Sequence, residues 1–103
     1  MFHAMECREE TALVSLHGRM TYSDHTGFRA LLAELLRTDA TRWRFDLSGL
    51  RFADSTAVIM LMVAREAAAE VGAAIEFQGA SGCVRRMCIV TGMTGLLPAE
   101  SAA

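Results

Sequence analysis

The segment with the clearest chemical potential contains three adjacent polar residues, Asp54, Ser55 and Thr56, directly before a long apolar run. We expect a helix to begin here, where the first backbone amides lack partners within the helix and the helix dipole favours added negative charge. A phosphate on the Ser55 hydroxyl would be stabilised at this position. The same residue types are also ordinary helix caps, and on these grounds alone capping is the favoured interpretation.

The expected helix opens with eight consecutive apolar residues, at 57–64. Eight successive positions point in every direction around a helix axis, whereas a helix that lies on a sheet buries one face. We therefore expect Ile59 and Val63 to stay uncovered and to form a docking face for a partner. Met60 can add an adaptable contact because its side chain is flexible. The alternative is that neighbouring helices and the preceding loop cover this run.

Catalytic and metal-binding patterns are missing from the sequence. There is no GxSxG motif, and the three histidines are expected in an edge strand, at a strand end and in a cap region, so they form neither a hydrolase site nor a metal-ligand set. Asp46 and Asp54 are only two carboxylates, whereas a magnesium-dependent phosphoaspartate site needs a cluster of them. Asp46 is interpreted as a strand-end residue that accepts hydrogen bonds from loop amides. The sequence predicts a binding protein that is not an enzyme, with no catalytic residue, no cofactor and no metal.

Composition limits the kinds of partner. The 103 residues are 52% hydrophobic and carry a net charge of −2, which argues against a protein held to nucleic acid or anionic lipid by bulk charge. The apolar runs are too short to cross a membrane. Three cysteines without paired CxxC spacing fit reduced thiols, so we expect a cytoplasmic protein.

The elements that position Ser55 follow from periodicity. Alternation predicts strands at 2–7, 11–17, 43–47 and 73–77, with Gly18 ending the second and Ser48-Gly49 ending the third. Three- and four-residue spacing predicts a helix after Ser23 or Asp24 with apolar positions through Leu36, a second helix at 54–71, and a third after Ser81 that ends before Gly92. The pattern also allows a short turn around 95–97.

This order predicts an α/β fold. Strands separated by helices require crossover connections, so the sheet is expected to be small, mixed and mostly parallel, with four strands and an antiparallel N-terminal edge strand. Right-handed crossovers place the three to four helices mainly on one side. The expected domain spans residues 1–98, and 99–103 form a flexible C-terminal tail.

The chain resembles the STAS domain family of bacterial anti-sigma factor antagonists over nearly its whole length. The strongest matches are 46–50 followed by 52–56, the 64–72 helix end that leads into the strand at 74–77, and the segments 84–87 and 91–93. The element order derived above is also that of the family. The resemblance implies that Ser55 is phosphorylated by an anti-sigma factor that is itself an ATP-dependent kinase.

A partner switch is the function that this resemblance implies. With Ser55 free, the domain would bind the anti-sigma kinase, so that a sigma factor is released, and phosphorylation would abolish that binding. The added charge makes docking costly at a site that must lose its water. The neighbours of the phosphorylation site would be Asp54, Thr56, Ala57, Thr21 and Asp24.

The chain departs from the family pattern at two places. The family usually has glycine where Ala57 stands, with small residues at Ile59 and Val63, so a partner would meet extra bulk. Members that switch often carry an aspartate where this chain has Thr21, for which Asp24 can partly substitute. The alternative function is therefore a STAS scaffold or ligand-sensing module that is not phosphorylated and belongs to a larger signalling or transport assembly. Either protein would be a monomer or a weak homodimer.

Overall fold

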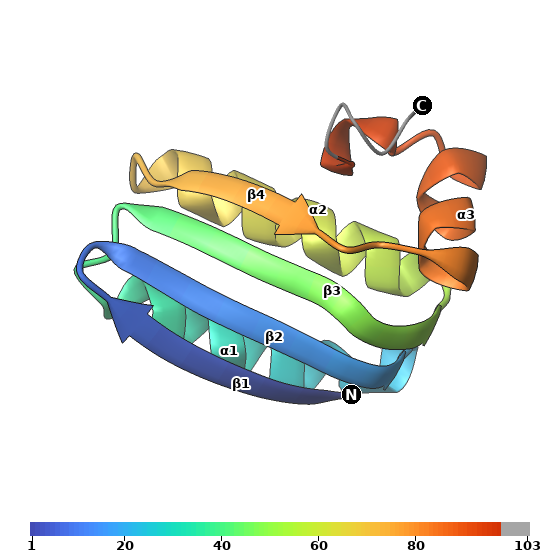
Figure 1. Ribbon diagram of the computed structural model, residues 1–103, viewed down its shortest axis with the longest axis horizontal. Helices are drawn as coiled ribbons and strands as arrows, with labels where there is room; N and C mark the ends of the chain where they lie inside the picture. Colours follow the sequence, from blue (N-terminus) through green and yellow to red (C-terminus); the bar gives the residue numbers. More distant parts are fainter. Residues whose placement is uncertain (98–103) are drawn as a thin grey trace.

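The computed structural model describes residues 1–97, which form a four-stranded sheet with the strand order β1-β2-β3-β4. β1 (Phe2–Arg8) pairs antiparallel with β2 (Thr11–Met20), whereas β2, β3 (Arg42–Ala53) and β4 (Ala74–Gln78) are parallel. The helices α1 (His25–Leu36) and α2 (Ser55–Glu70) lie on one face of the sheet (Figure 1). The expected α/β class, the mixed sheet and its antiparallel edge strand are confirmed. The predicted tail at 99–103 lies outside the described residues.

β2 runs further than the sequence indicated. Its alternating residues Ala12, Val14 and Leu16 are buried beneath the helices, as period two requires. The expected end at Gly18 is wrong, because the strand continues to Met20. Gly18 has φ +86°, a conformation that glycine adopts without steric cost, so it marks an irregularity inside the strand.

β3 likewise passes through its expected end at Ser48-Gly49 and continues to Ala53. The pairing shows how the chain accommodates the break. Between two successive pairs β2 advances from Ser15 to His17 while β3 advances from Asp46 to Gly49, and a second extra residue follows on β3 before Phe52. Such bulges re-aim a strand without ending it, and here they direct β3 towards the start of α2.

The core lies between the sheet and its two covering helices. The rings of Phe28 on α1, Phe45 on β3 and Phe77 on β4 form a series, with centroids 6.4 Å and 5.3 Å apart. On α1 the expected apolar positions are buried except Leu36, which is exposed in the last turn. α2 ends as expected before Gly72, whose φ of +72° suits the residue after a helix.

The third helix, α3 (Gly82–Val90), closes the end of the sheet at which the parallel strands finish (Figure 1). Val84 and Cys88 anchor it in the core, and the Cys83 thiol lies 3.8 Å from the Ala53 carbonyl oxygen at the end of β3. A short 3-10 helix, η2 (Thr94–Leu96), follows, near the expected turn. None of the helices in residues 1–97 is long and apolar enough to cross a membrane.

Candidate functional site

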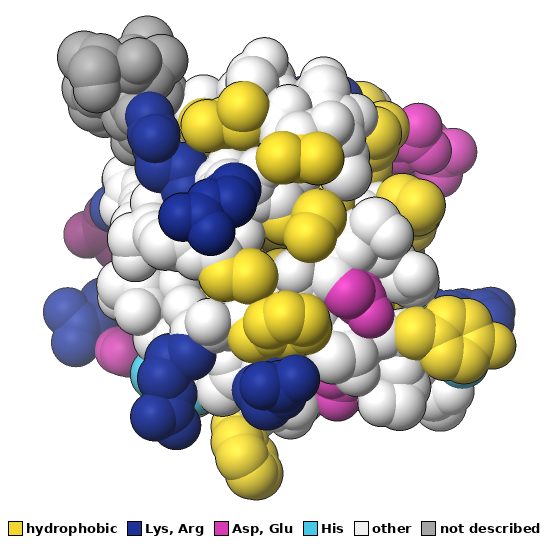
Figure 2. All heavy atoms as spheres, turned by 90° about the vertical axis from the view of Figure 1, so that its right-hand side faces the viewer, with side chains coloured by type: hydrophobic (Ala, Val, Ile, Leu, Met, Phe, Trp, Pro, Cys, Tyr) yellow, Lys and Arg dark blue, Asp and Glu magenta, His cyan; other side chains and the backbone are white. Residues whose placement is uncertain are grey.

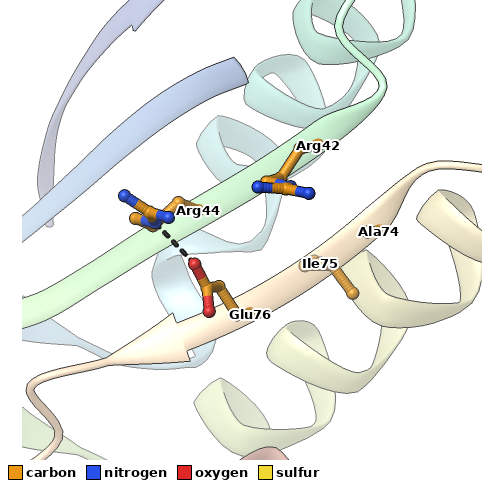
Figure 3. A pocket seen from close by; sticks show the side chains of 5 residues that line it. All are labelled: Arg42, Arg44, Ala74, Ile75 and Glu76. Carbon is orange, nitrogen blue, oxygen red and sulfur yellow. Dashed lines mark hydrogen bonds and ion pairs between the residues drawn. The ribbon is translucent and has the colours of Figure 1, made fainter. Parts of the chain in front are cut away.

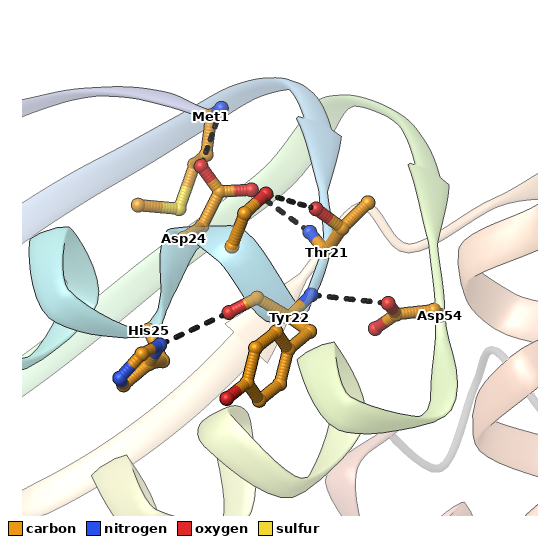
Figure 4. A network of polar contacts seen from close by, with 7 residues as sticks. Met1, Thr21, Tyr22, Asp24, His25 and Asp54 are labelled. Atoms are coloured by element: carbon orange, nitrogen blue, oxygen red, sulfur yellow. Dashed lines mark hydrogen bonds and ion pairs between the residues drawn. The ribbon is translucent and has the colours of Figure 1, made fainter.

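Asp54 caps the N-terminus of α2 and ties it to the turn after β2. Its Oδ1 accepts a hydrogen bond from the Ala57 amide at 2.8 Å, and its Oδ2 accepts one from the Tyr22 amide at 3.0 Å (Figure 4). Asp54 has extended backbone angles and Ser55 is the first helical residue. Capping is therefore the task of Asp54, and the Ser55 side chain is exposed beside it.

The turn that Asp54 holds is the 3-10 helix η1 (Tyr22–Asp24), which joins β2 to α1. Asp24 Oδ2 accepts the Thr21 amide at 2.8 Å, and Asp24 Oδ1 pairs with the Met1 amine at 3.1 Å (Figure 4). Burial raises the pKa of Asp24, but the hydrogen bond from Thr21 and the amine outweigh it and hold that pKa below its ordinary value. Asp24 is thus engaged within its own turn.

The structure brings the expected neighbours of Ser55 together from two distant segments. Thr21 and Asp24 flank the segment whose Tyr22 amide donates to Asp54, so these residues lie in one network of polar contacts (Figure 4). Sequence reasoning missed Tyr22. The residue is 66% exposed, and the centre of its ring lies 5.3 Å from that of the His25 ring. An aromatic residue in a polar turn at the end of a strand is the signal that could have identified it, because aromatic side chains are frequent binding anchors.

α2 presents an apolar stripe that begins at Ser55. Residues four apart share a helix face, and Ile59 and Val63 follow Ser55 at that spacing with side chains 53% and 46% exposed. We call Ser55, Ile59 and Val63 the α2 stripe. Large apolar side chains at this exposure on adjacent turns leave a face uncovered by the chain's own core.

Two residues that were expected to meet a partner at this face, Met60 and Ala57, are buried instead. Met60 is only 7% exposed and belongs to the core, because it points about 100° away from Ile59 around the helix. Its interpretation as a partner contact is wrong. Ala57 is fully buried, with its amide on Asp54, so its methyl group does not meet a partner as expected. Thr56, between Ser55 and Ala57, is half-buried. The bulky side chains that a partner would meet on this face are those of Ile59 and Val63.

The end of the molecule that carries α3 and the start of α2 combines apolar and basic side chains. Figure 2 shows yellow side chains gathered on this face, with arginines along one side of them. On α3, Ile89 and Val90 are exposed, and a shallow groove of about 310 Å³ is lined by Gly82, Arg85, Arg86 and Ile89. Such a surface suits contact with a protein more than with a small molecule.

Asp46 accepts hydrogen bonds as expected, but its expected place at a strand end is wrong, because β3 continues to Ala53 and Asp46 lies inside it. The Ser48 hydroxyl and then the Ser48 amide, which is 3.0 Å from Oδ1, hold the pKa of Asp46 below its ordinary value, and His17 adds a smaller electrostatic effect. The neighbouring Gly79 has φ +79°, and a Cβ there would lie 2.9 Å from the Ser48 Cβ. The carboxylate therefore stabilises the irregular part of β3 between Asp46 and Gly49.

A second surface groove crosses the open face of the sheet. Figure 3 shows its lining by Arg42, Arg44, Ala74, Ile75 and Glu76, around a volume of about 210 Å³. Arg44 on β3 forms an ion pair with Glu76 on β4, and both side chains are about two-fifths exposed. An exposed pair of this kind contributes little stability, and it keeps this part of the sheet face polar.

Comparison with protein families identifies the fold. The chain matches the family described as "Mlab, STAS domain" over residues 3–98, and it therefore belongs to the STAS domain family. No curated protein matches it in sequence.

Solved structures show the same fold at low sequence identity. The anti-sigma factor antagonist SpoIIAA in its unphosphorylated form has a TM-score of 0.79 at 18% identity, over 98% of this chain and 92% of that one. An anti-sigma factor antagonist from Mycobacterium paratuberculosis has a TM-score of 0.81 at 16% identity, over 94% and 82%. The STAS domain of a SulP transporter from Vibrio cholerae has a TM-score of 0.66 at 12% identity, over 92% and 73%. The expected likeness to anti-sigma factor antagonists is confirmed.

Proposed function

We propose that this chain is a partner-switching protein that acts by binding rather than by catalysis. Its unphosphorylated form binds an anti-sigma factor with serine kinase activity in the cytoplasm, and phosphorylation of Ser55 ends that binding. The observation that carries the proposal is the position of Ser55. Its exposed hydroxyl begins the α2 stripe, so a kinase that reaches the hydroxyl also covers Ile59 and Val63.

The geometry lets a phosphate change binding without unfolding the domain. A phosphoserine carries about −1.5 to −2 charges at neutral pH, and the first turn of a helix stabilises negative charge. Asp54 already satisfies the Ala57 amide, so the cap does not depend on the Ser55 hydroxyl. The phosphate is thus tolerated in the free protein.

In the complex the same phosphate is unfavourable. It would stand beside the Asp54 carboxylate and next to the apolar side chain of Ile59, at a surface that must lose its water when a partner docks. Burying a charge without a counter-charge costs several kcal/mol, so even a small part of that cost, about 1.4 kcal/mol, lowers affinity tenfold. The difference between free and bound states makes Ser55 a switch.

The relatives of similar fold support this mechanism by analogy. SpoIIAA is an anti-sigma factor antagonist whose structure is known in an unphosphorylated and in a phosphorylated form, and this chain matches both. The second also aligns over 98% of this chain, with a TM-score of 0.71. We carry over from SpoIIAA the class of partner and the covalent modification.

Phosphorylation can be tested directly by intact mass. The chain is incubated with ATP and a purified anti-sigma kinase, and we expect one added phosphate that is lost in Ser55→Ala. Ser81 is the matched control, because it too is an exposed serine at the start of a helix, and Ser81→Ala should leave the added mass unchanged. No added mass with a kinase of proven activity contradicts the proposal.

A second candidate is a binding module of a transport assembly that works without phosphorylation. The family description "Mlab, STAS domain" and the likeness to the STAS domain of a SulP transporter favour it. The exposed bulk of Ile59 and Val63, at places where the family resemblance leads us to expect small residues, favours it as well. The α2 stripe would then hold a constant partner. Binding of a transporter subunit that is equal for the unphosphorylated chain and for Ser55→Asp would favour this candidate.

A further inference from the structure

β1 is an edge strand of unusual regularity. It lies at the outer end of the strand order, and its seven residues pair with β2 from Phe2 opposite His17 to Arg8 opposite Thr11 without a register shift. Figure 1 shows its outer edge along the border of the sheet. An edge strand presents alternate amide and carbonyl groups outward, and these groups can pair with a further strand.

The usual protection of an edge strand is weak in β1. Natural edges are blunted by charged side chains, lysine above all, and by proline, bulges, short length or inward-pointing charge. Phe2–Arg8 contains no lysine or proline, and its two charged residues, Glu6 and Arg8, form an ion pair with each other at 2.9 Å. Glu6 lies opposite Leu13, so this pair is on the sheet face that α1 and α2 leave open, and no charge points towards the helices. The opposite edge strand, β4, is two residues shorter.

We propose that β1 joins two copies of this chain, edge to edge and antiparallel, into a dimer with a continuous eight-stranded sheet. Antiparallel pairing of a strand with its own copy closes under two-fold symmetry. A register centred on Met5 uses all seven residues. It places Met5 opposite Met5 of the second copy, Ala4 opposite Glu6, and Phe2 opposite Arg8.

This register also covers the most exposed large apolar side chain of the described residues. Phe2 is 77% exposed, and the dimer places the Arg8 guanidinium of the second copy across from its ring. The chain already contains such a contact, since the Arg19 guanidinium carbon lies 4.4 Å from the centre of the Phe52 ring. Met5 packs partly against the core, and its counterpart extends that apolar layer across the two-fold axis.

The strand pair is a small contact, so the dimer is weak and depends on concentration. Sedimentation equilibrium over the micromolar to submillimolar range measures it. We expect the mass to rise from that of the 11.2 kDa chain towards twice that value. Ala4→Glu places a carboxylate opposite Glu6 of the second copy at two symmetric positions, and we expect the dissociation constant to increase at least tenfold.

Ala74→Glu is the matched control, because Ala74 is an exposed alanine on the open sheet face of the other edge strand. It should leave the dissociation constant within about twofold of the wild-type value. Hydrogen exchange of the unmutated chain gives a second readout, since the outward amides of β1 should exchange more slowly as concentration rises.

A monomeric mass at every concentration overturns the dimer, as does an unchanged dissociation constant in a folded Ala4→Glu variant. A dimer that Ala74→Glu disrupts instead would assign the contact to β4 and also overturn the proposal. These outcomes are independent of Ser55, whose phosphorylation is measured on the denatured chain by mass.

Discussion

Replacement of Asp54 by alanine tests how α2 and η1 are held at the proposed switch. The carboxylate makes two hydrogen bonds, to the Ala57 amide at 2.8 Å within the first turn of α2 and to the Tyr22 amide at 3.0 Å. Loss of a helix cap costs about 1 kcal/mol, and loss of a second hydrogen bond whose donor can turn to water costs about 1 kcal/mol. We therefore expect Asp54→Ala to lower the free energy of unfolding by about 2 kcal/mol.

Urea unfolding at neutral pH, followed by circular dichroism, measures this change. Asp54→Asn retains one acceptor oxygen and can keep the cap while losing the bond to Tyr22, so we expect about half the effect, near 1 kcal/mol. Asp39, an exposed residue in the loop after α1, is the control, and Asp39→Ala should change stability by less than about 0.5 kcal/mol. An Asp54→Ala variant as stable as the wild type would refute the assigned cap and its link to η1.

Three further results follow from the same geometry. Ser55→Asp should change the free energy of unfolding by less than about 1 kcal/mol in urea titrations, because a carboxylate is tolerated in the first turn of a helix; a larger loss would mean that the site cannot carry a phosphate in the folded protein. Joint replacement of Ile59 and Val63 by serine should abolish partner binding in titration calorimetry with little change in melting temperature. Met60→Ser, in the core, should instead lower the free energy of unfolding by about 3 kcal/mol or more. The lowered pKa of Asp46 implies a contribution to folding stability that is present above its ordinary pKa of 3.8 and is lost as pH falls through the lower pKa of the folded state. On acid titration the free energy of unfolding of Asp46→Asn should therefore decline less steeply than that of the wild type. Identical acid titration curves would contradict this assignment.

The arrangement of the elements could be predicted from local patterns. The alternation in β2, the three- and four-residue spacing in α1 and the Gly72 stop of α2 each depend on nearby residues, and the structure confirms them. Strand ends were harder. Gly18 and Ser48-Gly49 are ordinary signals for the end of a strand, but pairing with a neighbouring strand absorbed them as bulges.

In the candidate site, too, features that depend on nearby residues could be predicted, whereas features that depend on distant contacts could not. Exposure of Ile59 and Val63 followed from the length of the apolar run, because one helix cannot bury every direction. Which of its methionines faces the core depends on how the helix is rotated on the sheet, and the sequence does not contain that angle; Met60 was therefore misplaced. The bond between Tyr22 and Asp54 joins residues 32 positions apart, so only the folded structure reveals it.

The affinity of one protein in two covalent states tests the switch most directly. The chain phosphorylated at Ser55 and the unmodified chain are each titrated into the same anti-sigma kinase, without ATP, by calorimetry. We expect the unmodified chain to bind and the phosphorylated chain to bind at least tenfold more weakly. Equal affinity of the two forms would contradict the account.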